Sequence, residues 1–182
     1  MLTRKACPEC AVKIAACSPP YCNDALVALS YEGLARDVML GFKYRNQRAV
    51  AALFAELLLA RLRTVQEIDH LDVVTWVPTT RERRMARGHD QAETLARIMG
   101  RSLGVPVRKL LERETAGHQT GHSRAQRLVG VALRARSMST PSTVLVVDDV
   151  VTTGATMRMA QQALTAAGAM RVVCIAVAAT PA

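Results

Sequence analysis

The sequence predicts an α/β domain whose mostly parallel sheet is flanked by helices, with a small cysteine-rich segment before it. Two observations lead to this fold class. Short β-branched apolar runs alternate with amphipathic helical segments, which is the pattern of βαβ units with parallel strands covered on both faces. Four of the five cysteines lie in residues 1–23, where apolar periodicity is nearly absent. We therefore expect a cysteine-rich segment at 1–23 and one domain at 24–182.

The predicted domain begins with a strand at 25–31 and helices at 32–42 and 47–63. In the second helix the apolar residues fall on one stripe of 3.6-residue period, as in a helix that faces a core. The run at 73–77 is short and β-branched and predicts a buried strand, followed by an arginine-rich polar loop. The remaining predicted elements are a helix at 90–103, a strand at 105–111, a long polar loop at 112–127, a helix at 124–135, a strand at 143–147, a helix at 156–167 and a strand at 171–178.

The chain lacks the sequence features of membrane insertion and secretion. No apolar run approaches the roughly 18–20 residues that a membrane-spanning helix needs. The first ten residues, MLTRKACPEC, lack the apolar stretch of a signal peptide. We therefore expect a cytoplasmic protein without membrane insertion.

The charge of the chain favours anionic partners. Twenty-four Lys and Arg residues against fifteen Asp and Glu give a formal net charge of +9. This charge attracts a phosphorylated nucleotide precursor and a nucleic acid equally, and a general preference of the organism for arginine also explains it. Aromatic residues make up only 3% of the chain, so the stacking surface usual in proteins that bind single strands is not visible.

The segment 144–157, VLVVDDVVTTGATM, has the features of a sugar-phosphate site. A buried strand runs into Asp148 and Asp149, and a turn with Gly154 leads into a helix. The glycine permits a close approach of the ligand, and hydroxyl groups, backbone N–H groups and the helix N-terminus offer an anion site. Because the two carboxylates would repel a phosphate, they are expected to face sugar hydroxyl groups or a divalent cation. The turn lacks the Gly-Lys-Ser/Thr ending of a nucleotide-binding Walker A loop.

This segment resembles the phosphoribosyl pyrophosphate (PRPP) signature of type I phosphoribosyltransferases almost position by position. The resemblance implies their fold and Mg²⁺ as the partner of PRPP. It also implies that Asp148 and Asp149, expected to be catalytic, bind the ribose 2′- and 3′-hydroxyl groups, while the following turn wraps the 5′-phosphate. The ribose-phosphate site expected on this basis comprises Asp148, Asp149, Val151, Thr152, Thr153, Gly154, Ala155 and Thr156.

Nearly the whole chain resembles the ComF (ComFC-like) branch of that superfamily, which is associated with competence for DNA uptake. The segments YEG at 31–33 and GFKYR at 41–45 resemble its Y-E-G and L-K-Y-R/K-G patterns. Val77-Pro78 and RMARGHDQ at 84–91 resemble its V-P-x-P and R-x-R-G-F-N-Q patterns. Two departures lie near the expected pyrophosphate side: Thr79-Thr80 replaces a small residue and a second proline, and His89-Asp90 replaces Phe-Asn.

Four arginines lie within the seven residues 81–87, shortly after Val77-Pro78. If this loop meets the sugar site, one or two of them are suited to clamp a pyrophosphate with paired hydrogen bonds. A solvated basic surface explains each arginine equally well. The pyrophosphate side is expected at Thr79, Thr80, Arg81 and Arg87.

The cysteine-rich segment predicts a structural zinc site. Its four cysteines, Cys7, Cys10, Cys17 and Cys22, lie within sixteen residues of a segment too poor in apolar residues to fold by burial alone. Disulfides are not expected in a cytoplasmic chain. The ComF branch usually carries two C-x2-C pairs, so the wider Cys17-x4-Cys22 spacing leaves four unligated thiols as the alternative. Cys174, in an apolar run, is expected in the core.

These patterns leave two functions open. The first is a Mg²⁺-dependent phosphoribosyltransferase that moves ribose 5-phosphate from PRPP to a nucleophile with loss of pyrophosphate. The second is a non-catalytic adaptor or DNA-binding module of the DNA-uptake machinery that retains the same fold. Its partners would be single-stranded DNA or DNA-uptake proteins.

Overall fold

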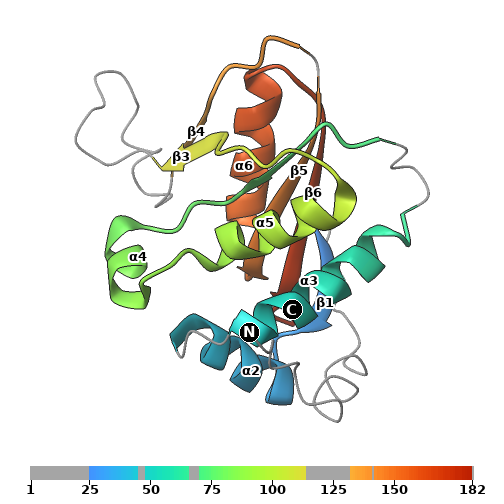
Figure 1. Cartoon of the computed structure of the whole chain (residues 1–182). Helices are drawn as coiled ribbons and strands as arrows, with labels where there is room; N and C mark the ends of the chain where they lie inside the picture. Colours follow the sequence, from blue (N-terminus) through green and yellow to red (C-terminus); the bar gives the residue numbers. More distant parts are fainter. Residues whose placement is uncertain (1–24, 45–47, 66–69, 114–131, 141, 182) are drawn as a thin grey trace.

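The computed structural model describes residues 25–44, 48–65, 70–113, 132–140 and 142–181. Its centre is a four-stranded parallel sheet in the order β1-β6-β5-β2 (Figure 1). The strands are β1 (Leu26–Ser30), β2 (Val73–Trp76), β5 (Ser142–Val151) and β6 (Ala169–Ala179). The predicted α/β class with a mostly parallel sheet is confirmed.

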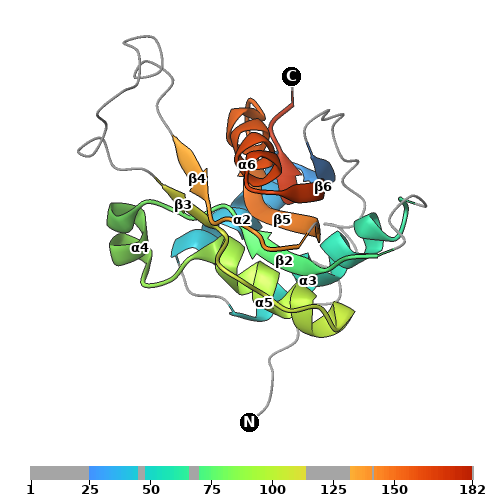
Figure 2. The same ribbon diagram turned by 90° about the horizontal axis from the view of Figure 1, so that it is seen from above.

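Helices cover both faces of this sheet. The helices α2 (Gly33–Tyr44), α3 (Arg48–Leu62) and α5 (Gln91–Leu103) pack against one face and share one buried core with it. The helix α6 (Ala155–Ala166) packs against the other face and forms a second core. Seen from above, α6 lies on one side of β5 and β6, and α2, α3 and α5 lie on the opposite side (Figure 2).

The apolar run before the acidic pair is buried because β5 lies in the middle of the sheet. Successive strand side chains point to opposite faces. Val144 and Val146 therefore enter the α6 core, and Leu145 and Val147 enter the core under α3 and α5. All four are 0% exposed. A strand covered on both faces needs a continuous apolar run, which is what this segment provides.

Helix α5 begins and ends close to the predicted positions because its two caps are encoded locally. Asp90 precedes the first turn, and its side chain accepts a hydrogen bond from the backbone N–H of Glu93 at 3.3 Å. Gly104 ends the helix in the left-handed conformation, with φ of 68°. The N-terminus of α5 is thereby fixed beside the end of β2.

The arginine-rich segment after β2, which was predicted as a loop, is the short helix α4 (Arg81–Arg87). Thr80 caps its N-terminus by accepting from the N–H of Arg83, and Gly88 ends it with φ of 75°. None of its residues is buried, so apolar periodicity gave no signal for it. The two caps explain the helix better than its composition does.

The segment between α5 and β5 differs most from the predictions. The predicted helix at 124–135 is wrong for Leu133–Ala135, which forms strand β4 and pairs antiparallel with β3 (Leu111–Arg113). The side chains of this ribbon pack against α6. That tertiary contact, rather than local helix propensity, decides the conformation.

The predicted strand at 105–111 begins as extended chain beside β2. Val107 forms a parallel bridge with Val74, whose N–H donates to the carbonyl of Pro106 at 2.9 Å. The N–H of Arg108 donates to the carbonyl of Val74 at 2.9 Å. Continuous pairing starts only at Leu111, in the separate ribbon with β4.

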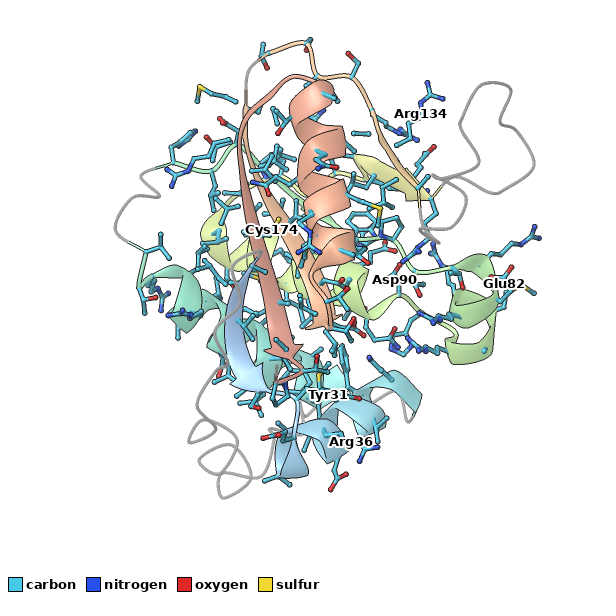
Figure 3. All side chains as sticks on the ribbon, turned by 180° about the vertical axis from the view of Figure 1, so that it is seen from behind. Tyr31, Arg36, Glu82, Asp90, Arg134 and Cys174 are labelled. Atoms are coloured by element: carbon cyan, nitrogen blue, oxygen red, sulfur yellow. The ribbon has the colours of Figure 1, made fainter. Side chains whose placement is uncertain are left out.

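Cys174 is buried in the core between the sheet and α6, as expected from its apolar surroundings (Figure 3). The cysteine-rich segment 1–23 and most of the predicted polar loop lie outside the described residues. In the part of the chain that the structure describes, no helix combines the length and the apolar character needed to cross a membrane.

Candidate functional site

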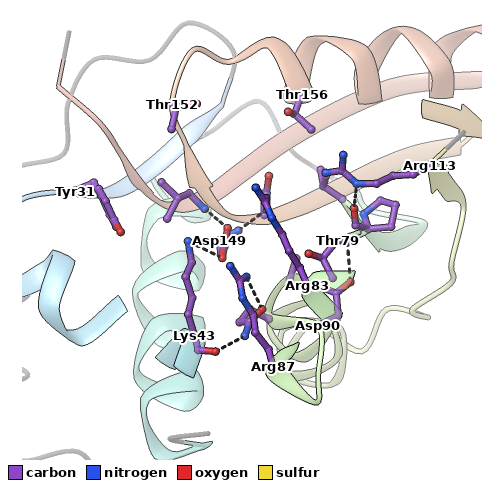
Figure 4. A pocket seen from close by; sticks show the side chains of 16 residues that line it. Tyr31, Lys43, Thr79, Arg83, Arg87, Asp90, Arg113, Asp149, Thr152 and Thr156 are labelled. Atoms are coloured by element: carbon purple, nitrogen blue, oxygen red, sulfur yellow. Dashed lines mark hydrogen bonds and ion pairs between the residues drawn. The ribbon is translucent and has the colours of Figure 1, made fainter. Parts of the chain in front are cut away.

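A cleft of about 370 Å³ opens where β2 and β5 end. Parallel strands present their carboxyl ends at the same edge, and ligands of such sheets bind beyond that edge. The residues that line the cleft come from β5 and α6, from the segment after β2 with α4 and α5, and from α2 and β3 (Figure 4). They are Tyr31, Lys43, Val77, Pro78, Thr79, Arg83, Arg87, Asp90, Gln91, Ala92, Arg113, Asp148, Asp149, Val150, Thr152 and Thr156.

The two adjacent carboxylates are held by the backbone at the end of β5. The N–H of Asp149 donates to Oδ1 of Asp148, and the N–H of Val150 donates to Oδ1 of Asp149, each at 2.7 Å. Oδ2 of Asp149 lies 3.1 Å from Nζ of Lys43. Of the four carboxylate oxygens, Oδ2 of Asp148 has no hydrogen-bond or ion-pair partner among the described residues.

The carboxyl group of Asp148 lies in electrostatically unfavourable surroundings. Its burial, followed by the negative charge of Asp149, raises the pKa of Asp148 well above its ordinary value. The N–H of Asp149 and the ammonium group of Lys43 oppose this rise, and the more distant Asp90 adds to it. A cation or a hydroxyl donor at this carboxylate would relieve the repulsion.

The turn after the carboxylates brings two of its three threonines to the cleft. Thr152 and Thr156 line it, whereas the Thr153 hydroxyl accepts from the N–H of Ala155 at 3.4 Å. Gly154 adopts the left-handed conformation, with φ of 73°, directly before α6. The backbone thus turns sharply and directs the N-terminus of α6 toward the cleft, an arrangement that suits an anion.

The remaining predicted members of the ribose-phosphate site belong to the backbone around the turn and do not line the cleft. Val151 is buried against α6, and Gly154 and Ala155 do not line the cleft. The carbonyl of Thr152 accepts from the hydroxyl of Thr180 at 3.3 Å, which ties the turn to the end of β6.

On the opposite side of the cleft, α4 directs two arginines inward. Arg83 and Arg87, one helical turn apart, both line the cleft (Figure 4). Of the residues predicted for the pyrophosphate side, Thr79 and Arg87 therefore lie in the cleft. Thr80 is the N-cap of α4, and Arg81 is exposed outside the cleft.

Asp90 connects this side of the cleft to α5. It is 5% exposed, and its Oδ2 accepts from the N–H of Thr79 at 3.0 Å while its Oδ1 accepts from Glu93. Burial raises the pKa of Asp90, and the two N–H donors oppose this rise. Figure 3 shows Asp90 inside the protein, whereas Glu82 points to solvent.

Several residues of the cleft were not included in the predicted site, among them Tyr31, Lys43, Gln91 and Arg113. Tyr31, Lys43 and Gln91 belong to the segments that resemble the ComF patterns, so that resemblance was a signal for them. No sequence signal pointed to Arg113, because it falls in the stretch that was predicted as a long polar loop. Its Nε donates to the carbonyl oxygen of Pro78, and burial lowers the pKa of Arg113 while the charge of Asp148 opposes the shift.

The described residues contain no group of three or more His, Cys, Asp or Glu side chains arranged to hold a metal ion by themselves. The four predicted zinc ligands lie outside the described residues. His89 does not line the cleft, since its Nδ1 lies 2.9 Å from the carbonyl oxygen of Arg87 and its ring contacts Phe42 edge-on.

The family described as "Phosphoribosyl transferase domain" matches residues 89–182, slightly more than half of the chain. A solved structure of an allosteric regulatory enzyme of purine biosynthesis is similar, with 23% identity and a TM-score of 0.50 over 71% of this chain and 26% of that chain. No curated protein matches the chain in a comparison of sequences.

Two further solved structures are similar over about the same share of the chain. The glutamine PRPP amidotransferase from B. subtilis in complex with ADP and GMP has 24% identity, a TM-score of 0.46 and coverage of 70% of this chain and 25% of that chain. The hypoxanthine phosphoribosyl transferase of Trypanosoma cruzi has 15% identity, a TM-score of 0.39 and coverage of 71% and 62%. The chain spans about a quarter of the length of the first two enzymes.

Proposed function

The chain belongs to the phosphoribosyl transferase domain family, and on that premise we propose that its cleft binds PRPP or another ribose 5-phosphate ligand and transfers the phosphoribosyl group to an acceptor. One observation carries the proposal. An acidic pair, a glycine turn with two threonines and a pair of arginines surround one cleft at the carboxyl ends of β2 and β5. These groups match the hydroxyl groups, the 5′-phosphate and the pyrophosphate of one ligand.

In this proposal the sugar lies against Asp148 and Asp149, whose carboxylate oxygens accept from its hydroxyl groups. The 5′-phosphate lies at the turn 152–156, where Thr152, Thr156 and the N-terminus of α6 donate to it. Val151, Thr153, Gly154 and Ala155 shape the backbone of that turn. A phosphate at this turn is separated from the two carboxylates, because the turn lies beyond the end of β5 that holds them.

The pyrophosphate group lies between Thr79, Arg83, Arg87 and Arg113 in our proposal. All four line the cleft, and Thr79, Arg83 and Arg87 lie apart from Thr152 and Thr156 of the turn (Figure 4). Guanidinium groups bind phosphate oxygens through paired, directed hydrogen bonds. Arg81, which lies outside the cleft, is not part of this arrangement.

The chemistry of the cleft also fits Mg²⁺. The family resemblance implies this ion, and Mg²⁺ prefers one or two carboxylates together with phosphate oxygens of the substrate. Asp148 fits this preference, since its Oδ2 has no partner among the described residues and repulsion from Asp149 raises its pKa. Asp148 would hold the ion, which would neutralise charge on the departing pyrophosphate.

The transfer replaces one bond at C1 of the ribose. The bond from C1 to the pyrophosphate oxygen breaks, a bond from C1 to the acceptor nucleophile forms, and the nucleophile loses its proton. The protein contributes by orienting the two reactants and by stabilising charge, which arginines on one side of the sugar and carboxylates on the other can do.

The resemblance to ComF proteins extends the proposal to a role in competence and DNA uptake. One observation favours a direct interaction with single-stranded DNA as the alternative function: Arg81, Arg83 and Arg84 of α4 are exposed. In that case binding should weaken steeply with salt, and the slope should become smaller when these arginines are neutralised. If single-stranded DNA does not bind at low salt, the DNA version of the proposal is wrong.

The proposal includes a structural Zn²⁺ ion held by Cys7, Cys10, Cys17 and Cys22. Its support is the spacing of these cysteines alone. The expected result is one zinc per chain by elemental analysis of the purified protein. A serine substitution at Cys7 or Cys10 should remove the metal, and a metal-free wild-type protein would favour four unligated thiols.

Calorimetry with PRPP, ribose 5-phosphate and nucleoside monophosphates, each with and without Mg²⁺, tests the ligand. We expect PRPP and ribose 5-phosphate to bind, and Asp149→Asn to weaken PRPP binding by about tenfold or more, as expected for hydrogen bonds to a charged group. Asp37→Asn, an exposed position on α2 outside the cleft, is the matched control. Unchanged PRPP affinity in Asp149→Asn would refute this placement of the sugar.

Turnover separates the enzyme from a binding module. The purified protein should release pyrophosphate from PRPP in the presence of Mg²⁺ and a nucleobase or amine acceptor. PRPP binding without turnover for any such acceptor would support the adaptor alternative.

A further inference from the structure

Lys43 is the only lysine among the residues that line the described cleft, and it comes from α2 rather than from the turn at 152–156 or the elements α4 and β3 that supply the arginines. Its side chain is 14% exposed, and its Nζ lies 3.1 Å from Oδ2 of Asp149, which is 17% exposed. The same Nζ lies 5.9 Å from the centre of the Tyr31 ring. A cation over an aromatic ring is attracted to it, so two neighbours hold the ammonium group in place.

The backbone of Lys43 is held as well. Nε2 of Gln91 donates to the carbonyl oxygen of Lys43 at 3.2 Å, and Nη1 of Arg87 donates to Oε1 of Gln91 at 3.3 Å (Figure 4). Gln91 is 1% exposed and is the first residue of α5. The end of α2 is therefore joined to the beginning of α5 and to α4.

These contacts determine how Asp149 is presented to a ligand. Its Oδ1 accepts from the N–H of Val150, and its Oδ2 contacts Lys43, so the plane of the carboxylate is set at both oxygens. An ionised carboxylate has about four acceptor positions, and a ligand hydroxyl group can still use those that remain. The ammonium charge also offsets the repulsion between Asp149 and Asp148.

We infer that Lys43 is a positioning residue of the sugar site, which holds the Asp149 carboxylate in the orientation that accepts from a ribose hydroxyl group. This inference rests on the proposed function, which places the sugar at Asp149. It deepens that proposal by making the end of α2 part of sugar recognition. The phosphate turn belongs to β5 and α6 and is independent of this contact.

The test compares the affinities for ribose 5-phosphate and inorganic phosphate, because their ratio isolates the contribution of the sugar. In Lys43→Met we expect this ratio to fall by about tenfold or more, since the sugar loses an oriented, charged acceptor. The affinity for inorganic phosphate should change far less. Lys43→Arg keeps the positive charge and should recover most of the ratio.

Lys109→Met is the matched control. Lys109 is half-exposed, pairs with Glu112 at 3.8 Å and does not line the cleft. The Lys109→Met substitution removes the same charge from the protein and should leave the ratio of the two affinities unchanged. If Lys43→Met does not fold, Lys43→Gln, which keeps a polar group near the carboxylate, provides the same comparison.

Three outcomes would overturn the inference. If wild-type protein binds ribose 5-phosphate more tightly than phosphate and Lys43→Met keeps the same ratio, the positioning role alone is wrong. If Lys43→Met weakens both ligands equally, Lys43 contributes only a general attraction for anions. If wild-type protein binds ribose 5-phosphate no more tightly than phosphate, the proposed function fails first and the inference falls with it.

Discussion

Asp148 and Asp149 are neighbours in the chain, yet their carboxyl groups lie in different surroundings. Lys43 balances the charge of Asp149, whereas burial and the charge of Asp149 raise the pKa of Asp148. Two carboxyl groups in different electrostatic surroundings are suited to different chemical roles. Asp149, whose two oxygens contact Lys43 and the N–H of Val150, is suited to accept hydrogen bonds in a fixed orientation, and Asp148 is suited to bind a cation.

The raised pKa of Asp148 predicts that Asp148→Asn stabilises the folded protein at neutral pH. Between the ordinary value of 3.8 and the higher folded value, the folded state binds more protons than the unfolded state. The free energy of unfolding of the wild-type protein therefore decreases as the pH rises through that interval, and the penalty remains above it. We expect a gain of about 0.5–2 kcal/mol for the variant at pH 7, as is common when a strained site residue is relieved.

Urea denaturation at several pH values measures this effect. The amide oxygen of the variant can still accept from the N–H of Asp149, so the backbone geometry is preserved. Asp37→Asn, which is exposed, should show no comparable gain. An Asp148→Asn protein less stable than the wild type at pH 7 would contradict the electrostatic account.

The conformation of Gly154 leads to a prediction about both stability and ligand binding. Its φ of 73° requires the left-handed conformation, so Gly154→Ala should cost roughly 1–2 kcal/mol of stability. Gly104, with φ of 68° at the end of α5, should show a similar cost on the same substitution, and an added Cβ there meets nothing within 4 Å. Only Gly154→Ala should also weaken ribose 5-phosphate binding, by about tenfold, because it alters the phosphate turn. Equal calorimetric affinities for the two variants would exclude a phosphate at this turn.

At the scale of elements, the cleft depends on short segments that have few buried contacts of their own. Helix α4 has no buried residue, and it is held by its caps and by the hydrogen bond of Arg87 to Gln91. Asp90 ties the segment after β2 to the N-terminus of α5. The arginine side of the cleft is therefore positioned by polar contacts, whereas the carboxylate side extends directly from a buried strand.

Thr80→Ala tests this division. Removing the N-cap should destabilise α4 by about 1 kcal/mol, but the free energy of global unfolding should change little because α4 buries nothing. Amide hydrogen exchange should become faster in α4, and the affinity for inorganic pyrophosphate should fall by about threefold or more. Thr165→Ala, at an exposed position of α6, is the control. Unchanged protection of the α4 amides would show that the cap is not what holds the helix.

At the scale of the whole molecule, the cleft exists because helices and strands from distant parts of the chain pack closely around the sheet. Helix α5 contacts both β2 and β5 and also approaches the extended chain at 105–107. Gly100 is the point of closest approach, since a Cβ there would overlap with Cγ2 of Val107 and lie 2.9 Å from the carbonyl oxygen of Val105. This packing sets the position of the helix whose first residues line the cleft.

Gly100→Ala should therefore destabilise the whole domain. Overpacking of this kind costs about 1–3 kcal/mol, and in a chain of this size each kcal/mol lowers the Tm by about 2–4 °C. Ser102→Ala, an exposed substitution in the same helix, should leave the Tm nearly unchanged. Thermal denaturation followed by circular dichroism makes the comparison, and equal Tm values would mean that Val107 and its strand adjust without cost.

The sequence by itself determined the features whose cause is local. The run Val144–Val147 predicts a strand covered on both faces, Gly154 predicts a sharp turn, and the caps Asp90 and Gly104 predict the limits of α5. The acidic pair and the threonines are contiguous in the chain, so their proximity in space needed no tertiary information. These features were sufficient to predict the fold class and the phosphoribosyltransferase family.

Only the tertiary structure decided which distant residues share the cleft. Lys43, Arg83 and Arg113 reach it from α2, α4 and β3, and no local pattern separates Arg83, which lines the cleft, from Arg81, which does not. The same holds for Leu133–Ala135, whose pairing with β3 overrides the predicted helix. The physical reason is that a side chain's direction and a strand's partner depend on packing between elements, and single-sequence periodicity contains no such contacts.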